Sequence, residues 1–284
     1  MKIIPCGIRG TAVTADDACR EFGGDTTCFV VRGAGGELLV IDAGTGVRGA
    51  NRILQEWAGA PSLLLLMTHY HLDHVIGFPL LSILHRPEWT LEIAAPDHGG
   101  FRAEEVMPHL LDPPFWPFQL KDARASVRFS TLPPRHAPAG TPHGGLSLRW
   151  CAVHHPGGCT AYRIDEPATG AAAVVATDFE WAESTAAERD DLVGLCAKPR
   201  PADVIFLDGQ FTAADYPASR KWGHSRGSDA VEIARLAGVR RLRVIHHAPG
   251  AADARLRGVE HELRRSMPEA ALARQDAAVE IPGL

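Results

Sequence analysis

The sequence predicts an α/β fold with two packed sheets. Short, strongly apolar runs alternate with segments of helical character and with loops rich in glycine and proline, a rhythm typical of α/β proteins. The two halves of the chain share a similar strand-rich pattern, which favours two sheets over one. Several apolar runs also end directly in an aspartate or a histidine, and this feature predicts where a functional site lies.

The predicted strands are short and mostly uncharged. Residues 28–42 (CFVVRGAGGELLVID) are predicted to form a hairpin, because Gly33, Gly35 and Gly36 can supply the positive φ angles of its turn. The other predicted strands are 62–67, 90–96, 146–154, 160–165, 171–177, 203–208 and 239–245, the last as a central strand.

Three segments have the pattern of helices. They are 51–58, the part of 75–84 beyond Pro79, and 228–238, which Gly238 closes. Between residues 97 and 145 the pattern loosens into proline-rich stretches, which predicts long loops beside a cleft. The aromatic residues of this region fit two roles equally well, as the wall of a substrate pocket or as local packing within the loop: Phe115, Trp116 and Phe118.

The length and composition indicate a globular protein. The chain of 284 residues is predicted to form one domain, 1–284, with a sizeable core. Its net charge of −5 argues against a protein that mainly coats nucleic acid. No secretory signal is recognised, and no apolar run approaches the roughly 20 residues that span a bilayer. Six cysteines without a CxxC pair are typical of buried reduced thiols, so a cytoplasmic location without a membrane partner is expected.

Six apolar runs end in a carboxylate or an imidazole. The residues at these ends are Asp42, His69, His155, Asp178, Asp208 and His246. In α/β proteins, sites form at the carboxyl ends of strands, where the rigid backbone fixes side chains and the following loops leave room for a ligand. The six residues are therefore predicted to share one site.

The stretch THYHLDH, residues 68–74, concentrates metal-binding side chains. It holds His69, His71, Asp73 and His74 directly after a buried strand. Imidazole and carboxylate are the usual ligands of zinc, and manganese and iron also use them. His69 and His71 point the same way in an extended segment, whereas Asp73 and His74 can reach a second ion. This density makes a chance polar loop a poor explanation.

The motif THYHLDH resembles the HxHxDH signature of the metallo-β-lactamase-fold hydrolases. The wider pattern is similar to their phosphodiesterase branch, which includes RNase Z. The segments that carry this resemblance are 7–10, 22–28, 39–46, 68–79, 154–158, 176–178, 207–211, 222–225 and 244–249. The resemblance implies an αββα sandwich of two mixed β-sheets flanked by helices, with a two-metal site on one edge.

The resemblance also implies which residues bind metal. It assigns His69, His71 and His155 to one ion, Asp73, His74 and His246 to the other, and Asp178 to both. Two divalent ions are implied, with zinc favoured over manganese or iron. His155 is preferred to His154 because it directly precedes Pro-Gly, and His246 to His247 because it comes first after the strand. The unused histidine of each pair is expected to be buried and hydrogen-bonded.

Other residues are implied to support the ions or the reaction. Asp42 is similar to an aspartate that orients metal ligands in the family, although aspartate is also a common turn residue. Asp208 and His224 match a pair beside the metals, in which the histidine stabilises the phosphoryl transition state or protonates the leaving oxygen. Structural roles at a strand end and a helix entry are the alternative. Asp73 is expected to align or deprotonate a metal-bound hydroxide.

The predicted function is hydrolysis of a small or cyclic phosphodiester. RNase Z grips tRNA with a long protruding arm, whereas only about two dozen residues, acidic at their start, separate Asp178 from the strand at 203–208. Nucleic acid is therefore not the favoured partner. Hydrolysis of a thioester or lactone, processing of RNA 3′ ends and a non-catalytic metal- or nucleotide-binding sensor are the alternatives. Relatives are often homodimers, but the sequence identifies no interface.

Overall fold

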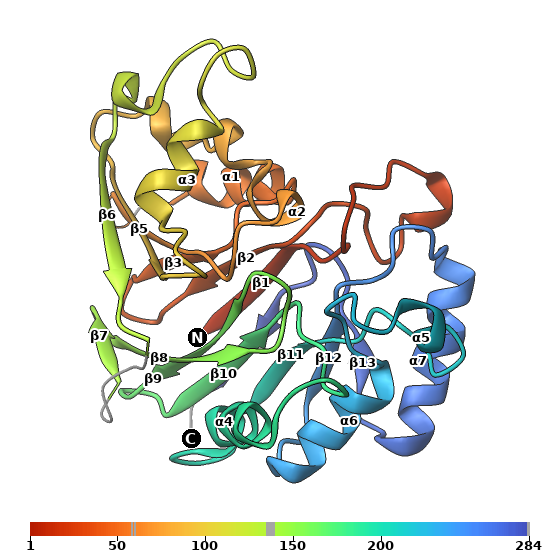
Figure 1. The fold of residues 1–284 in the computed structure, drawn as a ribbon. Helices are drawn as coiled ribbons and strands as arrows, with labels where there is room; N and C mark the ends of the chain where they lie inside the picture. Colours follow the sequence, from red (N-terminus) through yellow and green to blue (C-terminus); the bar gives the residue numbers. More distant parts are fainter. Residues whose placement is uncertain (58, 60, 135–139, 283–284) are drawn as a thin grey trace.

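The computed structural model describes residues 1–57, 59, 61–134 and 140–282. These residues form two seven-stranded sheets that face each other, with helices on the two outer surfaces. Figure 1 shows α1 (Val47–Gln55), α2 (Leu72–Val75) and α3 (Ala103–His109) over the first sheet. The predicted αββα sandwich is therefore confirmed.

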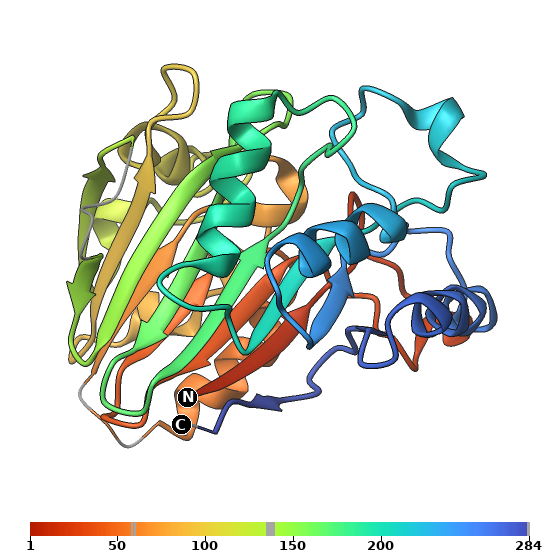
Figure 2. The same cartoon turned by 90° about the horizontal axis from the view of Figure 1, so that it is seen from below.

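The first sheet is mixed. Its strand order is β14-β1-β2-β3-β4-β5-β6. The pairs from β14 to β3 are antiparallel, and the pairs from β3 to β6 are parallel. The strands are β1 (Lys2–Gly7), β2 (Cys28–Arg32), β3 (Leu38–Ile41), β4 (Ser62–Leu66), β5 (Thr90–Pro96), β6 (Ser126–Leu132) and β14 (Val279–Glu280). Because β1 pairs with β14, the two ends of the described chain lie together (Figure 2).

The second sheet is also mixed. Its order is β13-β12-β11-β10-β9-β8-β7, with antiparallel pairs from β7 to β10 and parallel pairs from β10 to β13. Its strands are β7 (Thr141–His143), β8 (Leu146–Val153), β9 (Cys159–Glu166), β10 (Ala171–Ala176), β11 (Val204–Asp208), β12 (Leu242–Ile245) and β13 (Ala271–Leu272). The outer helices here are α4 (Ala186–Ala197), α6 (Gly227–Leu236) and α7 (Asp253–Ser266).

The central strands are buried on both faces. In β2, Phe29 and Val31 point into the layer between the sheets, where Phe29 meets Phe206 of β11 with ring centroids 5.4 Å apart. Val30, between them, packs with the helices of the outer layer. Side chains alternate across a strand, so a strand buried on both faces must be apolar throughout. The central strands therefore appear in the sequence as continuous apolar runs.

The remaining helical elements are short. They are α5 (Tyr216–Ser219) and the 3₁₀ helices η1 (Asp17–Cys19), η2 (Phe78–Leu80), η3 (Ser82–His85) and η4 (Leu120–Asp122). No helix in the part of the chain that the structure describes has both the length and the apolar character of a membrane span.

Several predicted elements need correction. The helix expected at 51–58 begins at Val47, inside the turn after β3, and the one expected beyond Pro79 is a pair of 3₁₀ helices. The region 97–145 is not mainly loop, since it contains α3, β6 and β7. The last predicted strand begins at Leu242 rather than at residue 239, and it lies next to the edge strand β13 rather than at the centre. The helices α4 and α7 had not been predicted.

Two of the three aromatic residues of the 97–145 region have the packing role, and the third is exposed. Trp116 and Phe118 pack against the outer core of the first sheet, and Phe118 contacts the ring of His85. Phe115 is 80% exposed. For Trp116 and Phe118, packing is therefore the observed role.

Candidate metal centre

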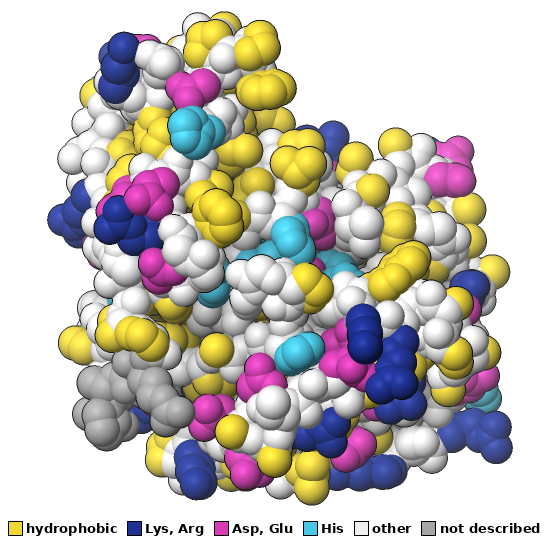
Figure 3. All heavy atoms as spheres, in the orientation of Figure 1, with side chains coloured by type: hydrophobic (Ala, Val, Ile, Leu, Met, Phe, Trp, Pro, Cys, Tyr) yellow, Lys and Arg dark blue, Asp and Glu magenta, His cyan; other side chains and the backbone are white. Residues whose placement is uncertain are grey.

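The candidate site lies at one edge of the sandwich, where six strands end. Asp42 follows β3, His69 comes shortly after β4, and Asp208 ends β11. The other three are His155, Asp178 and His246, which follow β8, β10 and β12. Since β8 runs antiparallel to β9 and β9 antiparallel to β10, β8 and β10 end on the same side. In Figure 3, histidine side chains gather in a hollow near the centre of this face.

The backbone is unusual around this edge. Among the described residues, six other than glycine have a positive φ, and five of these lie in the site or beside it. The five are Thr11, Asp42, Asp178, Lys221 and His246. Such conformations cost about 1–3 kcal/mol each and persist where the surrounding structure imposes them. Their concentration here indicates that the fold stabilises a strained edge to place these side chains.

A first cluster joins three histidines and one aspartate. The ligand atoms of His69, His71, His155 and Asp178 lie within 4.8 Å of one another. Nε2 of His155 lies 3.1 Å from Nδ1 of His71, and Nε2 of His69 lies 3.6 Å from Oδ2 of Asp178. Ligand atoms at about 2.0–2.1 Å from a tetrahedral ion are separated by roughly 3.3 Å. The spacing therefore fits an ion between them.

A second cluster shares Asp178 with the first. It contains Asp73, His74, Asp178 and His246, again within 4.8 Å. Nε2 of His74 and Nε2 of His246 lie 3.2 and 3.1 Å from Oδ1 of Asp178. Oδ2 of the same carboxylate is the atom that faces the first cluster. The two oxygens of Asp178 thus face different clusters, which is the geometry of a ligand that bridges two ions.

The donor atoms of these clusters are incompletely satisfied. Nε2 of His69 and Nε2 of His74 are buried and form no hydrogen bond with the described residues. Buried polar atoms in proteins almost always have a partner, and a bound ion can be the partner where no hydrogen bond is formed. Neutral imidazole nitrogens with carboxylate oxygens are the donor set of zinc, manganese and iron. The residues therefore fit divalent metals.

Hydrogen bonds hold the far sides of the imidazole rings. Nδ1 of His74 lies 2.8 Å from Oδ2 of Asp42, and Nδ1 of His155 lies 2.8 Å from the carbonyl oxygen of Gly223. Asp42 itself accepts hydrogen bonds of 2.7 Å from the amide and hydroxyl of Thr68. When Nδ1 donates, Nε2 is left unprotonated and can bind a cation. Asp42 thus lies behind His74, a proposed ligand, as the resemblance implied.

Electrostatics favour a bound cation. Burial lowers the pKa of His69 well below its usual value and that of His155 to about 4, which keeps both rings neutral. Burial acts in the same direction on His246, but the Asp178 carboxylate and the hydrogen bond to Asp73 outweigh it and raise the pKa of His246 to about 9. A negative potential that holds a proton on an imidazole also favours a metal ion.

A third group lies against the second cluster. Nδ1 of His224 is 2.9 Å from Oδ2 of Asp208, and the His224 ring stacks on His246 with centroids 4.6 Å apart. Asp208 is fully buried and also accepts hydrogen bonds from the amides of Phe179 and Gln210. The carboxylate therefore fixes the orientation of His224, and it leaves Nε2 as the nitrogen that can face a substrate.

The comparisons with known proteins agree with this geometry. The family described as the beta-lactamase superfamily domain matches residues 38–247, more than half of the chain. The chain belongs to the β-lactamase superfamily. Together with the histidine and aspartate clusters, this membership indicates a metal-binding hydrolase.

Relatives of this superfamily member include a ribonuclease Z and solved structures of the same fold. A ribonuclease Z from Bradyrhizobium sp. (strain ORS 278) is 26% identical over an alignment of 260 residues, and the match covers 76% of this chain and 82% of that protein. The metallo-beta-lactamase fold protein YhfI from Bacillus subtilis has a TM-score of 0.72 at 18% identity, over 98% of this chain and 99% of that one. A diphosphatase from the PhnP family has a TM-score of 0.68 at 17% identity, over 100% and 99% of the two chains. The predicted resemblance to the RNase Z-like branch is therefore confirmed.

The two histidines of this β-lactamase-superfamily chain that were predicted not to bind metal differ in their burial. His247 is buried, and its Nε2 lies 2.9 Å from the carbonyl oxygen of Ala273, as expected of the unused partner of His246. His154 was expected to be buried too, and this was wrong: its side chain is 41% exposed and lies 3.6 Å from Glu188. Ala152 of β8 is exposed as well, so His154 lies next to solvent and needs no buried partner.

Some residues of the site had not been predicted at all. The amide of Thr11 donates a 2.8 Å hydrogen bond to Oδ2 of Asp73, and Thr68 holds Asp42. The carbonyl of Gly223 orients His155, and a Cβ atom at Gly223 would lie 2.3 Å from Nδ1 of that ring. These contacts are made largely by backbone atoms, and residue type says little about where a backbone atom lies.

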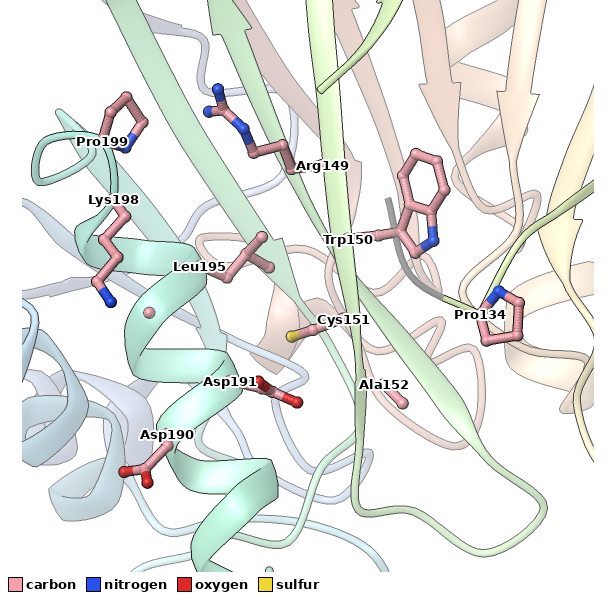
Figure 4. Close-up of a pocket in the computed structure, with 11 residues that line it drawn as sticks. Pro134, Arg149, Trp150, Cys151, Ala152, Asp190, Asp191, Leu195, Lys198 and Pro199 are labelled. Carbon is pink, nitrogen blue, oxygen red and sulfur yellow. The ribbon is translucent and has the colours of Figure 1, made fainter. Parts of the chain in front are cut away.

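A large cavity of the structure lies elsewhere. It measures about 690 Å³, and its lining includes Arg149 and Cys151 of β8 and Asp190 and Leu195 of α4 (Figure 4). Cys151 and Leu195 lie between the helix and the strand in this view. None of its lining residues belongs to the metal-binding clusters, so this cavity is not part of the candidate metal centre.

The contact between Asp42 and His74 leads to a testable expectation. Asp42→Asn keeps the side-chain size and tolerates the positive φ, but it replaces one oxygen by an NH2 donor. It therefore cannot accept both the Thr68 amide at Oδ1 and the Thr68 hydroxyl and His74 at Oδ2. We expect metal affinity to fall by about 10–100-fold, as measured by competition with a chromogenic chelator. The matched control is Asp203→Asn, which alters an aspartate that also accepts a strand amide, that of Ala172. Equal affinity in the Asp42→Asn and wild-type proteins would contradict this role.

Proposed function

We propose that the protein is a two-metal phosphodiesterase that acts on a small or cyclic phosphodiester. The observation that carries the proposal is the pair Asp208–His224, set against the second cluster with its hydrogen bond of 2.9 Å. Hydrolysis of a phosphodiester needs a proton for the leaving oxygen, and an imidazole held beside a carboxylate is suited to that role. The pair can supply this proton, which the metal ligands alone do not provide.

In this proposal the ions are bound by the two clusters. His69, His71 and His155 would hold one ion, Asp73, His74 and His246 would hold the other, and Asp178 would be shared between them. Two divalent ions supply Lewis-acid activation of water and neutralise charge on a phosphoryl oxygen. Zinc is favoured by the predominance of imidazole ligands, with manganese or iron as the alternatives.

The chain's own residues complete the reaction. Oδ2 of Asp73 accepts a hydrogen bond from the amide of Thr11, and this carboxylate is placed to orient the attacking water and take its proton. The imidazolium form of His224 donates its Nε2 proton to the leaving oxygen. Asp208 stabilises that charged form and holds the ring through Nδ1. The burial of both groups limits solvent reorganisation around them.

Two features support a small substrate over RNA. The segment between Asp178 and β11 forms α4, which lies over the second sheet (Figure 2). Its buried residues Leu192, Leu195 and Cys196 belong to the core on that side of the sheet. A helix packed in this way is not a projecting arm. Arg241 and Arg243, near the start of β12, donate to the backbone carbonyls of Glu280 and Glu269 instead of forming a free basic surface. The ribonuclease Z relative keeps RNA 3′-end processing as the alternative.

The proposal predicts metal-dependent turnover of bis(p-nitrophenyl) phosphate. Zinc- or manganese-reconstituted protein should release p-nitrophenolate, and a chelator should abolish this release. Removal of the ions should also lower the Tm, because a ligand that binds only the folded state stabilises it. A thioester and a β-lactam are assayed alongside. Protein that holds two ions and cleaves no phosphodiester would refute the proposal, and activity on the thioester would identify a thioester hydrolase instead.

A further inference from the structure

The segment after α5 carries an exposed tryptophan at the edge of the metal centre. Trp222 is 64% exposed. The next residue, Gly223, is in direct contact with the site, since its carbonyl oxygen lies 2.8 Å from Nδ1 of His155. His224 follows. An indole group is therefore presented to solvent by a backbone that is packed against a proposed metal ligand.

A buried carboxylate fixes this backbone. Glu180 is 1% exposed and lies two residues after Asp178. Its Oε1 accepts a 2.7 Å hydrogen bond from the amide of Lys221, and its Oε2 accepts a 2.8 Å hydrogen bond from the amide of Gly223. The hydroxyl of Tyr216 donates a third hydrogen bond, of 2.6 Å, to Oε1. The two amides on either side of Trp222 are thus held by one side chain.

The same backbone has little freedom to move. Lys221 and Gly223 both have positive φ angles, 68° and 89°. A Cβ atom at Gly223 would meet His155 at 2.3 Å and Pro156 at 2.5 Å, so the segment is tightly packed from the inner side. An exposed aromatic side chain on a rigid backbone loses little conformational entropy when it binds a ligand.

The charge beside Trp222 favours an anionic aromatic ligand. Lys221 is exposed and forms no ion pair with any other residue that the structure describes. The neighbouring Arg220 and Arg226, in contrast, are paired with Glu183 and Asp229. A planar apolar surface next to an unpaired cation, one residue before a backbone that contacts the proposed phosphodiester site, matches a nucleotide. In such a complex the planar base would contact Trp222, and the negative phosphate would be attracted by Lys221.

We propose that Trp222 determines substrate specificity by stacking on a nucleobase, with Lys221 providing positive charge beside it. This inference rests on the proposed function, because it names the part of the phosphodiester that lies next to the cleaved bond. Stacking between a base and an aromatic side chain tolerates every base, since each has a planar face. The substrate class is therefore nucleoside phosphodiesters, with little selection among bases.

Binding of two phosphomonoesters, AMP and ribose 5-phosphate, tests this role without requiring turnover. They share the ribose and the phosphate and differ by the base. Calorimetric titration of the metal-reconstituted protein should give tighter binding of AMP, and Trp222→Ala should weaken AMP about tenfold while ribose 5-phosphate binds as before. Trp222→Phe should retain most of the preference. The matched control is Leu236→Ala, which removes another large exposed apolar side chain, 60% exposed, on α6.

The outcomes separate this inference from the proposed function. Unchanged AMP affinity in Trp222→Ala, or an equal loss for AMP and ribose 5-phosphate, would overturn the role of Trp222 even if the wild-type protein cleaves phosphodiesters. A selective loss for AMP would support the role even if the phosphodiester assay failed. An equal loss of AMP affinity in Leu236→Ala and Trp222→Ala would also overturn it. Loss of an exposed apolar side chain far from Trp222 in the sequence would then have the same effect as loss of Trp222 itself.

Discussion

Asp178→Asn is expected to remove metal binding from both clusters at once. Oδ1 and Oδ2 of Asp178 face different clusters, at 3.2 Å from His74 and 3.6 Å from His69. Asparagine keeps the shape and tolerates the φ of 45°, but it removes the negative charge and turns one oxygen into a donor. We expect fewer than two ions per chain by elemental analysis. Turnover should fall by roughly 10³-fold or more, comparable to losses of charge stabilisation in other hydrolases.

A control for this variant is Asp229→Asn. Asp229 is also a buried aspartate, but it pairs with Arg226 at 2.7 Å and lies outside both clusters. This variant should hold the same number of ions as the wild-type protein. Retention of two ions and of normal turnover in Asp178→Asn would show that the shared carboxylate is not a bridging ligand.

His224→Ala is expected to slow the reaction without loss of metal. His224 contacts Asp208 and stacks on His246, but it is not a member of either four-residue cluster. A general acid contributes about 10²–10⁴-fold to a rate, so kcat should fall by that factor at unchanged metal content. The loss should be larger for an alkyl leaving group than for p-nitrophenolate, because p-nitrophenolate is stable without a proton.

His154→Ala provides the control for His224→Ala. His154 lies beside the proposed ligand His155 in the sequence, yet its side chain is 41% exposed and outside the clusters. Its removal should change neither metal content nor turnover. Equal losses for the two leaving groups in His224→Ala would exclude proton donation to the leaving oxygen and favour stabilisation of the phosphoryl charge. Wild-type turnover in that variant would remove His224 from the mechanism.

Much of the candidate site could be predicted because it combines two strong local patterns. Asp42, Asp178 and His246 each follow a buried apolar strand, and the carboxyl ends of such strands meet at one edge. His71 and Asp73 lie in a motif dense in metal-binding side chains. The structure places all of these residues within one site, although the metal roles of the cluster residues stay predictions until ions are measured.

The elements that were not predicted have weak local patterns. In α7, buried Leu256 and Leu263 are separated by a segment with Gly258 and many charged residues, so its apolar face is narrow. In α4, small and acidic residues fill the first turns. Both helices are stabilised by packing on the second sheet. Packing of this kind depends on residues that are distant in the sequence, and it overrides weak helix propensity.

The sequence by itself determined the strand ends, the metal-binding motif and the fold class, because hydrophobic periodicity and local spacing are properties of neighbouring residues. Only the tertiary structure decided that the two oxygens of Asp178 face two clusters, that the side chain of His154 is partly exposed, and that Glu180 holds the backbone around Trp222. The Glu180 contact joins residues about forty positions apart through backbone amides. Every residue except proline carries such an amide, so no pattern of side chains predicts the contact. It forms only when the segments that follow β10 and β11, neighbouring strands of the second sheet, lie together in the folded chain.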